Sequence, residues 1–199
     1  MIDIDRELQK NLPIVMMPKY SELDALKDNE KRLILGSNGI FIESKCKAIH
    51  CRLKIAPALD IPVPCGYVAK FLKVKQLEEW VKELIVKQSK LALPNEYCLL
   101  IVFDADKSEY QIVEPEVISC SPSEVKYKMP ELEKNQHIFI DYHTHGLGNA
   151  YFSATDNADD KTLGGTYFSV VAGKCDDKNP QFKTRLNIDG FNQDTINLW

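Results

Sequence analysis

Two histidines, a serine and an aspartate are spaced along the chain in a way that suits a metal centre. His143 and His145 are separated by one residue, and Ser153 and Asp156 follow after a loop of seven residues. In an extended strand, residues two apart project from the same face, so both imidazoles can reach one point. Two histidines and one carboxylate leave a fourth position on zinc for water, as a catalytic zinc site requires. The spacing therefore predicts a catalytic Zn2+ bound by His143, His145 and Asp156.

The same segment also matches the start of a helix. Ser153 followed three residues later by Asp156 is typical of an N-cap with a carboxylate in the first turn. The two interpretations are compatible, because one turn can serve both purposes. Asp159 and Asp160 are expected to lie on a solvated helix face. Asp141, two residues before the first histidine, shares the histidine face of its strand, where it either hydrogen-bonds a ligand imidazole or faces solvent.

The string from His143 to Asp156 resembles the JAMM motif of the MPN/JAB metalloproteases, isopeptidases that remove ubiquitin and ubiquitin-like proteins. That family also carries a glutamate after its first helix, at the start of a buried strand. Glu96 occupies this place, although Leu99 stands where the family usually has glycine. The resemblance implies that Glu96 transfers the proton of the attacking water and that Ser153 stabilises the oxyanion. Glu43 is the competing glutamate, but it precedes the helix, whereas the family order places the helix first.

Longer segments of the C-terminal half, such as HIFIDYHTHGLGNAYFSATDNADD, are similar to JAMM-type proteins of the PRTRC gene cassettes, a bacterial group with ParB-related and ThiF-related members. ThiF-like proteins adenylate β-grasp modifiers. The resemblance therefore implies a ubiquitin-like or sulfur-carrier-like protein substrate, with a ThiF/E1-like cassette protein as a further partner. A catalytically silent MPN scaffold is the alternative. Such scaffolds have usually lost a motif residue, and this chain retains all of them.

The elements that must position these residues follow from hydrophobic patterning. The apolar run 98–103 predicts a strand buried on both faces, with residues 110–115 as its hairpin partner. Apolar residues at intervals of three and four over 74–93 predict an amphipathic helix that ends before a proline. Residues 136–145 predict a strand that leads into the histidines, and 165–173 predict another buried strand. The expected class is α/β (α+β), a mixed sheet flanked by helices, which the resemblance makes an MPN/JAB-like (cytidine-deaminase-like) fold.

The front of the chain has a different pattern. Residues 1–70 are predicted to form a small β-rich region that precedes a JAMM/MPN metalloprotease domain at 71–199. Asn38 and Gly39 lie between two β-rich runs and give a strong hairpin signal.

The composition of the 199 residues excludes several classes of protein. Hydrophobic residues make up 44% and charged residues 27%, as in ordinary soluble domains. No apolar run approaches the roughly 18 to 20 residues of a spanning helix, and the acidic start differs from a signal peptide. The net charge is −4, and no basic stripe supports a phosphate-backbone partner. We therefore expect a cytoplasmic protein whose partners are neither nucleic acid nor membrane.

Other chemistries fit the sequence less well than zinc-dependent hydrolysis. The six cysteines are expected to be reduced, because disulfide frameworks belong to short secreted chains. Cys46, His50 and Cys51 suggest a zinc knuckle, but no fourth ligand completes it. A Cys/His nucleophile would leave the spacing from His143 to Asp156 unexplained. Zinc-dependent nucleobase deamination requires H-x-E followed by P-C-x-x-C, and the chain has neither.

Overall fold

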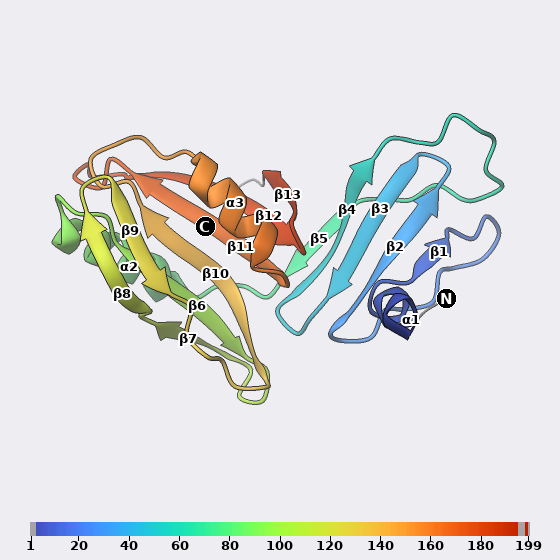
Figure 1. The fold of residues 1–199 in the computed structure, drawn as a ribbon, viewed down its shortest axis with the longest axis horizontal. Helices are drawn as coiled ribbons and strands as arrows, with labels where there is room; N and C mark the ends of the chain where they lie inside the picture. Colours follow the sequence, from blue (N-terminus) through green and yellow to red (C-terminus); the bar gives the residue numbers. More distant parts are fainter. Residues whose placement is uncertain (1–2, 195–197, 199) are drawn as a thin grey trace. The chain divides into compact units, whose positions relative to one another are not determined.

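The computed structural model describes residues 3–194 and 198. The chain divides into two compact units, Met1–Lys75 and Gln76–Trp199, each with its own sheet (Figure 1).

The N-terminal unit is built on a five-stranded sheet in the order β1-β2-β3-β4-β5, in which β1 is parallel to β2 and the other pairs are antiparallel. The predicted hairpin is confirmed as β2–β3, with Gly36 opposite Gly39 and Asn38 in the turn. The side chain of Asn38 bonds both the backbone N–H and the carbonyl of Val68, at 2.9 Å each. The elements are α1 (Asp3–Asn11), β1 (Ile14–Met16), β2 (Glu30–Gly36), β3 (Gly39–Lys45), β4 (Ile49–Ala56) and β5 (Phe71–Val74).

The predicted helix over 74–93 begins later than its periodicity suggests. Val74 belongs to strand β5, where it lies opposite Ile49 of β4, and the helix starts at Glu79. The pairing also extends past the strand, since the N–H of Lys75 donates to the carbonyl of Ala48 at 2.8 Å. A cross-strand partner distant in sequence therefore overrides the helical pattern at this point. The first unit runs to Lys75 for the same reason, beyond the division expected after residue 70.

The C-terminal unit contains a six-stranded mixed sheet in the order β13-β12-β11-β10-β6-β7. Strands β10 and β11 are parallel and the other neighbours are antiparallel, while β8 and β9 form a separate hairpin. The predicted mixed α+β fold with a β-rich front region is confirmed. The elements are α2 (Glu79–Ala92), β6 (Cys98–Asp104), β7 (Glu109–Val113), β8 (Glu116–Ser121), β9 (Glu124–Lys128), β10 (Gln136–Thr144), α3 (Ala154–Thr162), β11 (Thr166–Gly173), β12 (Gln181–Ile188) and β13 (Phe191–Asp194).

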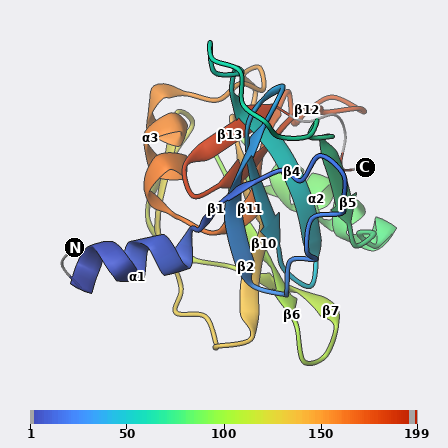
Figure 2. The same ribbon diagram turned by 90° about the vertical axis from the view of Figure 1, so that its right-hand side faces the viewer.

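The core of this unit lies between the sheet and its helices. Every residue of β6 is buried, as the unbroken apolar run predicts. Helix α2 buries Val81, Ile85 and Ser89, and the Ser89 hydroxyl lies 2.7 Å from the Tyr142 hydroxyl of β10. Figures 1 and 2 show α2 and α3 on opposite faces of the sheet. None of the helices in the described part of the chain has the length and apolar character needed to cross a membrane.

Candidate metal centre

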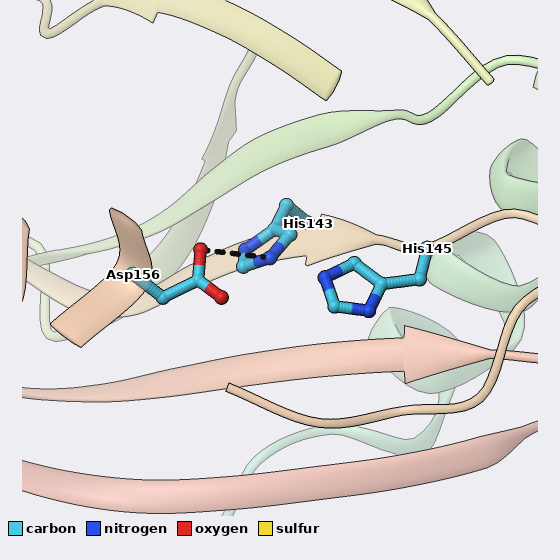
Figure 3. Close-up of side chains that lie close together, drawn as sticks. All are labelled: His143, His145 and Asp156. Carbon is cyan, nitrogen blue, oxygen red and sulfur yellow. Dashed lines mark ion pairs between the residues drawn. The ribbon is translucent and has the colours of Figure 1, made fainter. Parts of the chain in front are cut away.

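The three predicted ligands converge at the end of β10. His143 lies near the end of that strand, His145 directly after it, and Asp156 in the first turn of α3. Figure 3 shows the two imidazoles and the carboxylate pointing toward one another. One ligand atom from each residue lies within 4.8 Å of the others. Although His145 falls just past β10, its N–H donates to the carbonyl of Ala172 in β11 at 2.7 Å.

The donor set and its spacing fit zinc. Nε2 of His143 lies 3.3 Å from Oδ1 of Asp156. That distance matches the edge of a tetrahedron whose corners are about 2.0 Å from a central zinc, which is about 3.3 Å. Nδ1 of His145 lies 3.1 Å from the carbonyl oxygen of Asn149, which leaves Nε2 free to bind a metal. Three such ligands leave the fourth position of a tetrahedral ion open.

The loop between His145 and α3 is held against the end of β11. The N–H of Lys174 donates to the carbonyl of Gly148 at 2.6 Å, and that of Cys175 to the carbonyl of Gly146 at 2.9 Å. A Cβ on Gly173 would lie 2.2 Å from the backbone nitrogen of Ala150, so only glycine permits this close approach. These contacts fix the path of the loop, which brings Asp156 of α3 back toward the two histidines.

Asp156 serves as helix residue and candidate ligand through different oxygen atoms. Its Oδ2 accepts the N–H of Ser153 at 2.6 Å, and its own N–H donates to Oγ of Ser153 at 3.2 Å. These two bonds form a capping box. Its Oδ1 is the atom that faces His143. The helix start predicted for this segment is therefore confirmed, and it leaves one carboxylate oxygen available to a cation.

The charges of the site favour an ionised carboxylate. Burial alone would raise the pKa of Asp156, but the hydrogen bond and charge of His143 and the bonds from Ser153 hold it well below its ordinary value. Burial acts to lower the pKa of His143, and Asp156 outweighs it, so that pKa is raised. The pKa of His145 is lowered, first by burial and then by the charge of His143. His145 is thus kept neutral, the form that binds a metal.

Glu96 lies beside this cluster, two residues before β6 begins. It is 8% exposed, and burial raises its pKa, although the charge of His143 and a bond from the Val125 backbone act in the opposite direction. The connection to the histidines runs through Thr144, which is fully buried between them. The backbone N–H of Tyr97 donates to Oγ1 of Thr144 and the N–H of Thr144 to the Tyr97 carbonyl, both at 2.9 Å. Thr144 is not among the residues predicted from the sequence, where only its place between the two histidines singles it out.

The β8–β9 hairpin covers Glu96. The N–H of Glu96 donates to the carbonyl of Ser121 at 2.9 Å, and the Cys120 thiol donates to the carbonyl of Glu96 at 3.0 Å. A cavity of about 400 Å3 separates the hairpin from α3 and reaches Asp141. It is lined by residues of both elements, among them Glu124, Val125, Tyr127, Thr155, Asp159 and Leu163.

Asp141 has a partner that the sequence does not indicate. Its Oδ1 accepts the hydroxyl of Tyr127 at 2.7 Å, so this carboxylate joins β9 to β10. Burial raises the pKa of Asp141 to about 6. The expected solvent-exposed face is wrong for Asp160, which is 4% exposed and paired with Arg185 of β12. Asp159 is exposed, as expected.

Glu43, the competing glutamate, is buried in ion pairs with residues of the N-terminal sheet. It is 2% exposed and forms ion pairs with Arg32 at 2.7 Å, with His50 at 3.0 Å and with Arg52 at 3.1 Å. Nε2 of His50, a residue of the suggested zinc knuckle, is therefore paired with a carboxylate. Within residues 3–194 and 198, the histidine and aspartate cluster is the only group of side chains placed to hold a metal ion.

Comparison with known proteins gives one family match for each unit of the chain. Residues 3–75 match a domain family of unknown function, DUF2016, and residues 78–187 match the prokaryotic homologs of the JAB domain. A search of curated proteins finds no match. The solution structure of protein DSY2949 from Desulfitobacterium hafniense is similar at 15% identity and a TM-score of 0.44, over 60% of this chain and 88% of that one. Since the JAB model covers more than half of the 199 residues, the chain belongs to the family of prokaryotic JAB-domain homologs.

Proposed function

We propose that the protein is a zinc-dependent isopeptidase or peptidase that hydrolyses an amide bond at the C-terminal tail of a ubiquitin-like or sulfur-carrier-like protein. The observation that carries this proposal is the convergence of His143, His145 and Asp156 beside a buried carboxyl group, that of Glu96. A scaffold would not need a proton acceptor at this position. The PRTRC resemblance supports the substrate class and a ThiF/E1-like partner.

Glu96 is proposed to move the proton. Zinc bound by the three ligands would supply Lewis acidity, which makes a water acidic near pH 7 and polarises the substrate carbonyl. The carboxylate of Glu96 accepts the proton of the attacking water and later delivers it to the leaving amine. Burial of Glu96 brings its pKa toward the pH of reaction, which suits a group that must both accept and donate.

Ser153 is proposed to stabilise the charge that develops on the carbonyl oxygen. Its Oγ accepts a hydrogen bond from the N–H of Asp156 at 3.2 Å. The hydroxyl also forms a side-chain hydrogen bond with the carboxylate of Asp156, so its hydrogen is proposed to turn from that carboxylate to the oxyanion. The helix cap fixes the position of Oγ before the reaction, and a hydrogen bond from a donor held in this way strengthens as the oxyanion forms.

The substrate tail is proposed to enter in an extended conformation along β9. In the described residues β9 pairs with β8 alone, so its other edge offers to a peptide strand the main-chain groups that remain beside the Val125 bond to Glu96. The cavity of about 400 Å3 between β9 and α3 accommodates such a segment. The glycine-containing loop after His145 supports small residues next to the scissile bond. We expect a Gly-Gly tail to be cleaved much faster than a Phe-Phe tail.

Cleavage of fusion proteins tests the proposed function. Each ubiquitin-like protein encoded beside this gene is fused to a reporter through its tail, and release of the reporter is followed with and without a zinc chelator. We expect cleavage that stops with chelator, returns with added zinc and is absent from His143→Ala. If folded, zinc-loaded protein binds these modifiers and cleaves none of them, the protein is a scaffold and the proposal is wrong.

A further inference from the structure

Helix α3 packs against the sheet through a buried ion pair, whereas surface helices usually pack through apolar side chains. Its sequence, ATDNADDKT, contains no large apolar side chain, and Asp160 is the only one of its residues, all of them described, that is buried. Surface helices usually hold their place through a buried apolar stripe. The position of α3, and of Asp156 in its first turn, must therefore depend on what binds Asp160.

Arg185 of β12 is the buried partner of Asp160. The two residues are 3% and 4% exposed. Nε of Arg185 donates to Oδ2 of Asp160, and Nη2 forms an ion pair with the same oxygen. Oδ1 of Asp160 accepts the hydroxyl of Tyr167 at 2.9 Å and that of Ser169 at 2.7 Å. Both carboxylate oxygens are thus bonded, as a buried ion pair requires if it is not to destabilise the fold.

The same guanidinium group also holds the first turn of α3. Its Nη1 donates to Oδ1 of Asn157 at 2.5 Å, and its Nη2 donates to the backbone carbonyl of Asp156 at 3.0 Å. Its Cζ lies 3.8 Å from the centroid of the Phe152 ring, directly before the helix cap. Only the planar fork of arginine, with five N–H donors, makes all these contacts at once; a lysine ammonium does not.

We infer that Arg185 is a positioning residue for the metal centre. It fixes the backbone of Asp156, whose Oδ1 lies 3.3 Å from Nε2 of His143. His143 is placed by β10 and Arg185 by β12, and both strands belong to one sheet. Arg185 thereby sets the distance between ligands from two different elements. This inference rests on the zinc site of the proposed function.

Zinc affinity of the full chain, measured by competition with a chromophoric chelator at fixed pH, tests the inference. Loss of contacts that orient metal ligands typically weakens affinity by about 10- to 100-fold, and we expect this for Arg185→Lys. The visible absorption of the Co2+-substituted protein reports coordination geometry and should change as well. Tyr142→Phe is the matched control. It removes the buried 2.7 Å bond to Ser89 on the α2 side of the sheet and should leave the zinc Kd and the cobalt spectrum unchanged.

A double variant separates positioning from stability. Replacing a buried ion pair by apolar residues is often neutral for folding, so Arg185→Met combined with Asp160→Leu should fold and still bind zinc as weakly as Arg185→Lys. Asn157→Ala, at an exposed position, keeps the ion pair and should give a smaller loss in the same direction.

Three results would overturn the inference. The first is a wild-type zinc Kd and cobalt spectrum in Arg185→Lys. The second is a loss of zinc affinity in Arg185→Lys that is fully accounted for by the fraction of the variant that circular dichroism shows to be unfolded. If Arg185→Lys and the double variant both fail to fold, a wild-type Kd in Asn157→Ala is the third. A wild-type protein that binds no zinc would instead refute the metal site, and with it the proposed function.

Discussion

The two oxygens of Asp156 make separate contributions that can be tested separately. Oδ2 completes the helix cap with Ser153, and Oδ1 faces His143. Asparagine retains an acceptor for the cap but presents an amide, a poor zinc ligand, to the histidines. We therefore expect Asp156→Asn to lose zinc while its apoprotein melts closer to wild type than that of Asp156→Ala, since a lost cap costs about 1 kcal/mol.

Elemental analysis and thermal melting check this prediction. Wild-type protein purified without added metal should carry close to one zinc per chain, and His143→Ala should carry little. Retention of zinc by both Asp156→Asn and His143→Ala would show that the metal is held elsewhere.

Glu96→Gln separates proton transfer from metal binding. Glutamine keeps the shape of the side chain but cannot take a proton, so zinc content and substrate binding should persist while turnover collapses. General acid and base groups contribute about 100- to 10,000-fold in rate, so we expect a loss of about 3 kcal/mol or more in transition-state stabilisation. The measurement is kcat at saturating substrate, together with zinc content.

Glu43→Gln is the matched control for Glu96→Gln. Its buried ion pairs with Arg32 and Arg52 make it a stability residue. Well below its melting temperature the variant should retain wild-type kcat. Full activity in Glu96→Gln with none in Glu43→Gln would assign the base to the front sheet and reverse our interpretation.

Ser153 has two roles that alanine removes together. Ser153→Ala loses the cap, at about 1 kcal/mol of stability, and the oxyanion donor, at about 3 kcal/mol of barrier. Ser153→Thr keeps a hydroxyl for both roles and should recover most of kcat and of the melting temperature. Recovery of melting temperature without kcat would indicate that the hydroxyl does not reach the oxyanion. Kinetics and melting of the two variants decide the matter.

The sequence predicts the residues of the metal centre better than the residues around them. His143, His145 and Asp156 are visible because their spacing is local and their side chains are chemically distinctive. Arg185 and Asp160 lie 25 residues apart in sequence and in different elements, and nothing in either segment indicates the other. Asp160 looks like one of several acids on a polar helix, and only the structure shows that it is buried.

At the scale of elements, prediction from the hydrophobic pattern fails where strand pairing with a distant segment determines the local structure. Val74 fits the first turn of an amphipathic helix, but hydrogen bonding of β5 to β4 makes it a strand residue. The buried strand β6 could be predicted because its unbroken apolar run is of strand length and too short for a typical helix. The position of the β8–β9 hairpin over Glu96 could not be predicted in this way, because five of the six residues of β8 are exposed and show no pattern of buried positions.

The ion-pair cluster of the front sheet makes that element sensitive to acid. Burial favours the neutral form of Glu43, but hydrogen bonds from Arg32 and His50 and the charge of Arg52 outweigh it and lower its pKa below the ordinary 4.5. A lowered pKa in the folded state contributes stability that is fully present above about pH 4.5 and is lost as the pH falls through the folded value. Acidification should therefore weaken this sheet.

Comparison with Glu43→Gln isolates this contribution. Removing one partner of a buried pair costs on the order of 3 kcal/mol at pH 7. The difference in unfolding free energy between wild type and variant should shrink as the pH falls below about 4.5, because the carboxyl group of the unfolded wild type takes up its proton first and that of the folded wild type only at a lower pH. Denaturant melts at pH 7 and at pH 4 or lower give the two values. A difference that stays constant would exclude the linkage.

At the scale of the whole molecule, the chain combines two units with separate hydrogen-bond ladders. The five strands β1 to β5 pair only with one another among the described residues, and the six-stranded sheet and the β8–β9 hairpin lie wholly after Gln76. The two family matches, at 3–75 and 78–187, divide the chain at the same place. The candidate ligands, the capping box and the Arg185 clamp all belong to the second unit.

This division predicts that residues 76–199 alone form the metal centre. Every hydrogen bond that we assign to the placement of His143, His145 and Asp156 comes from within that segment. We expect the isolated segment to unfold in one cooperative transition and to bind a single zinc with the affinity of the full chain. Calorimetry and chelator competition measure both properties. If the segment is folded but binds zinc more than tenfold more weakly, the front sheet contributes to the site, and the metal centre is a property of the complete chain.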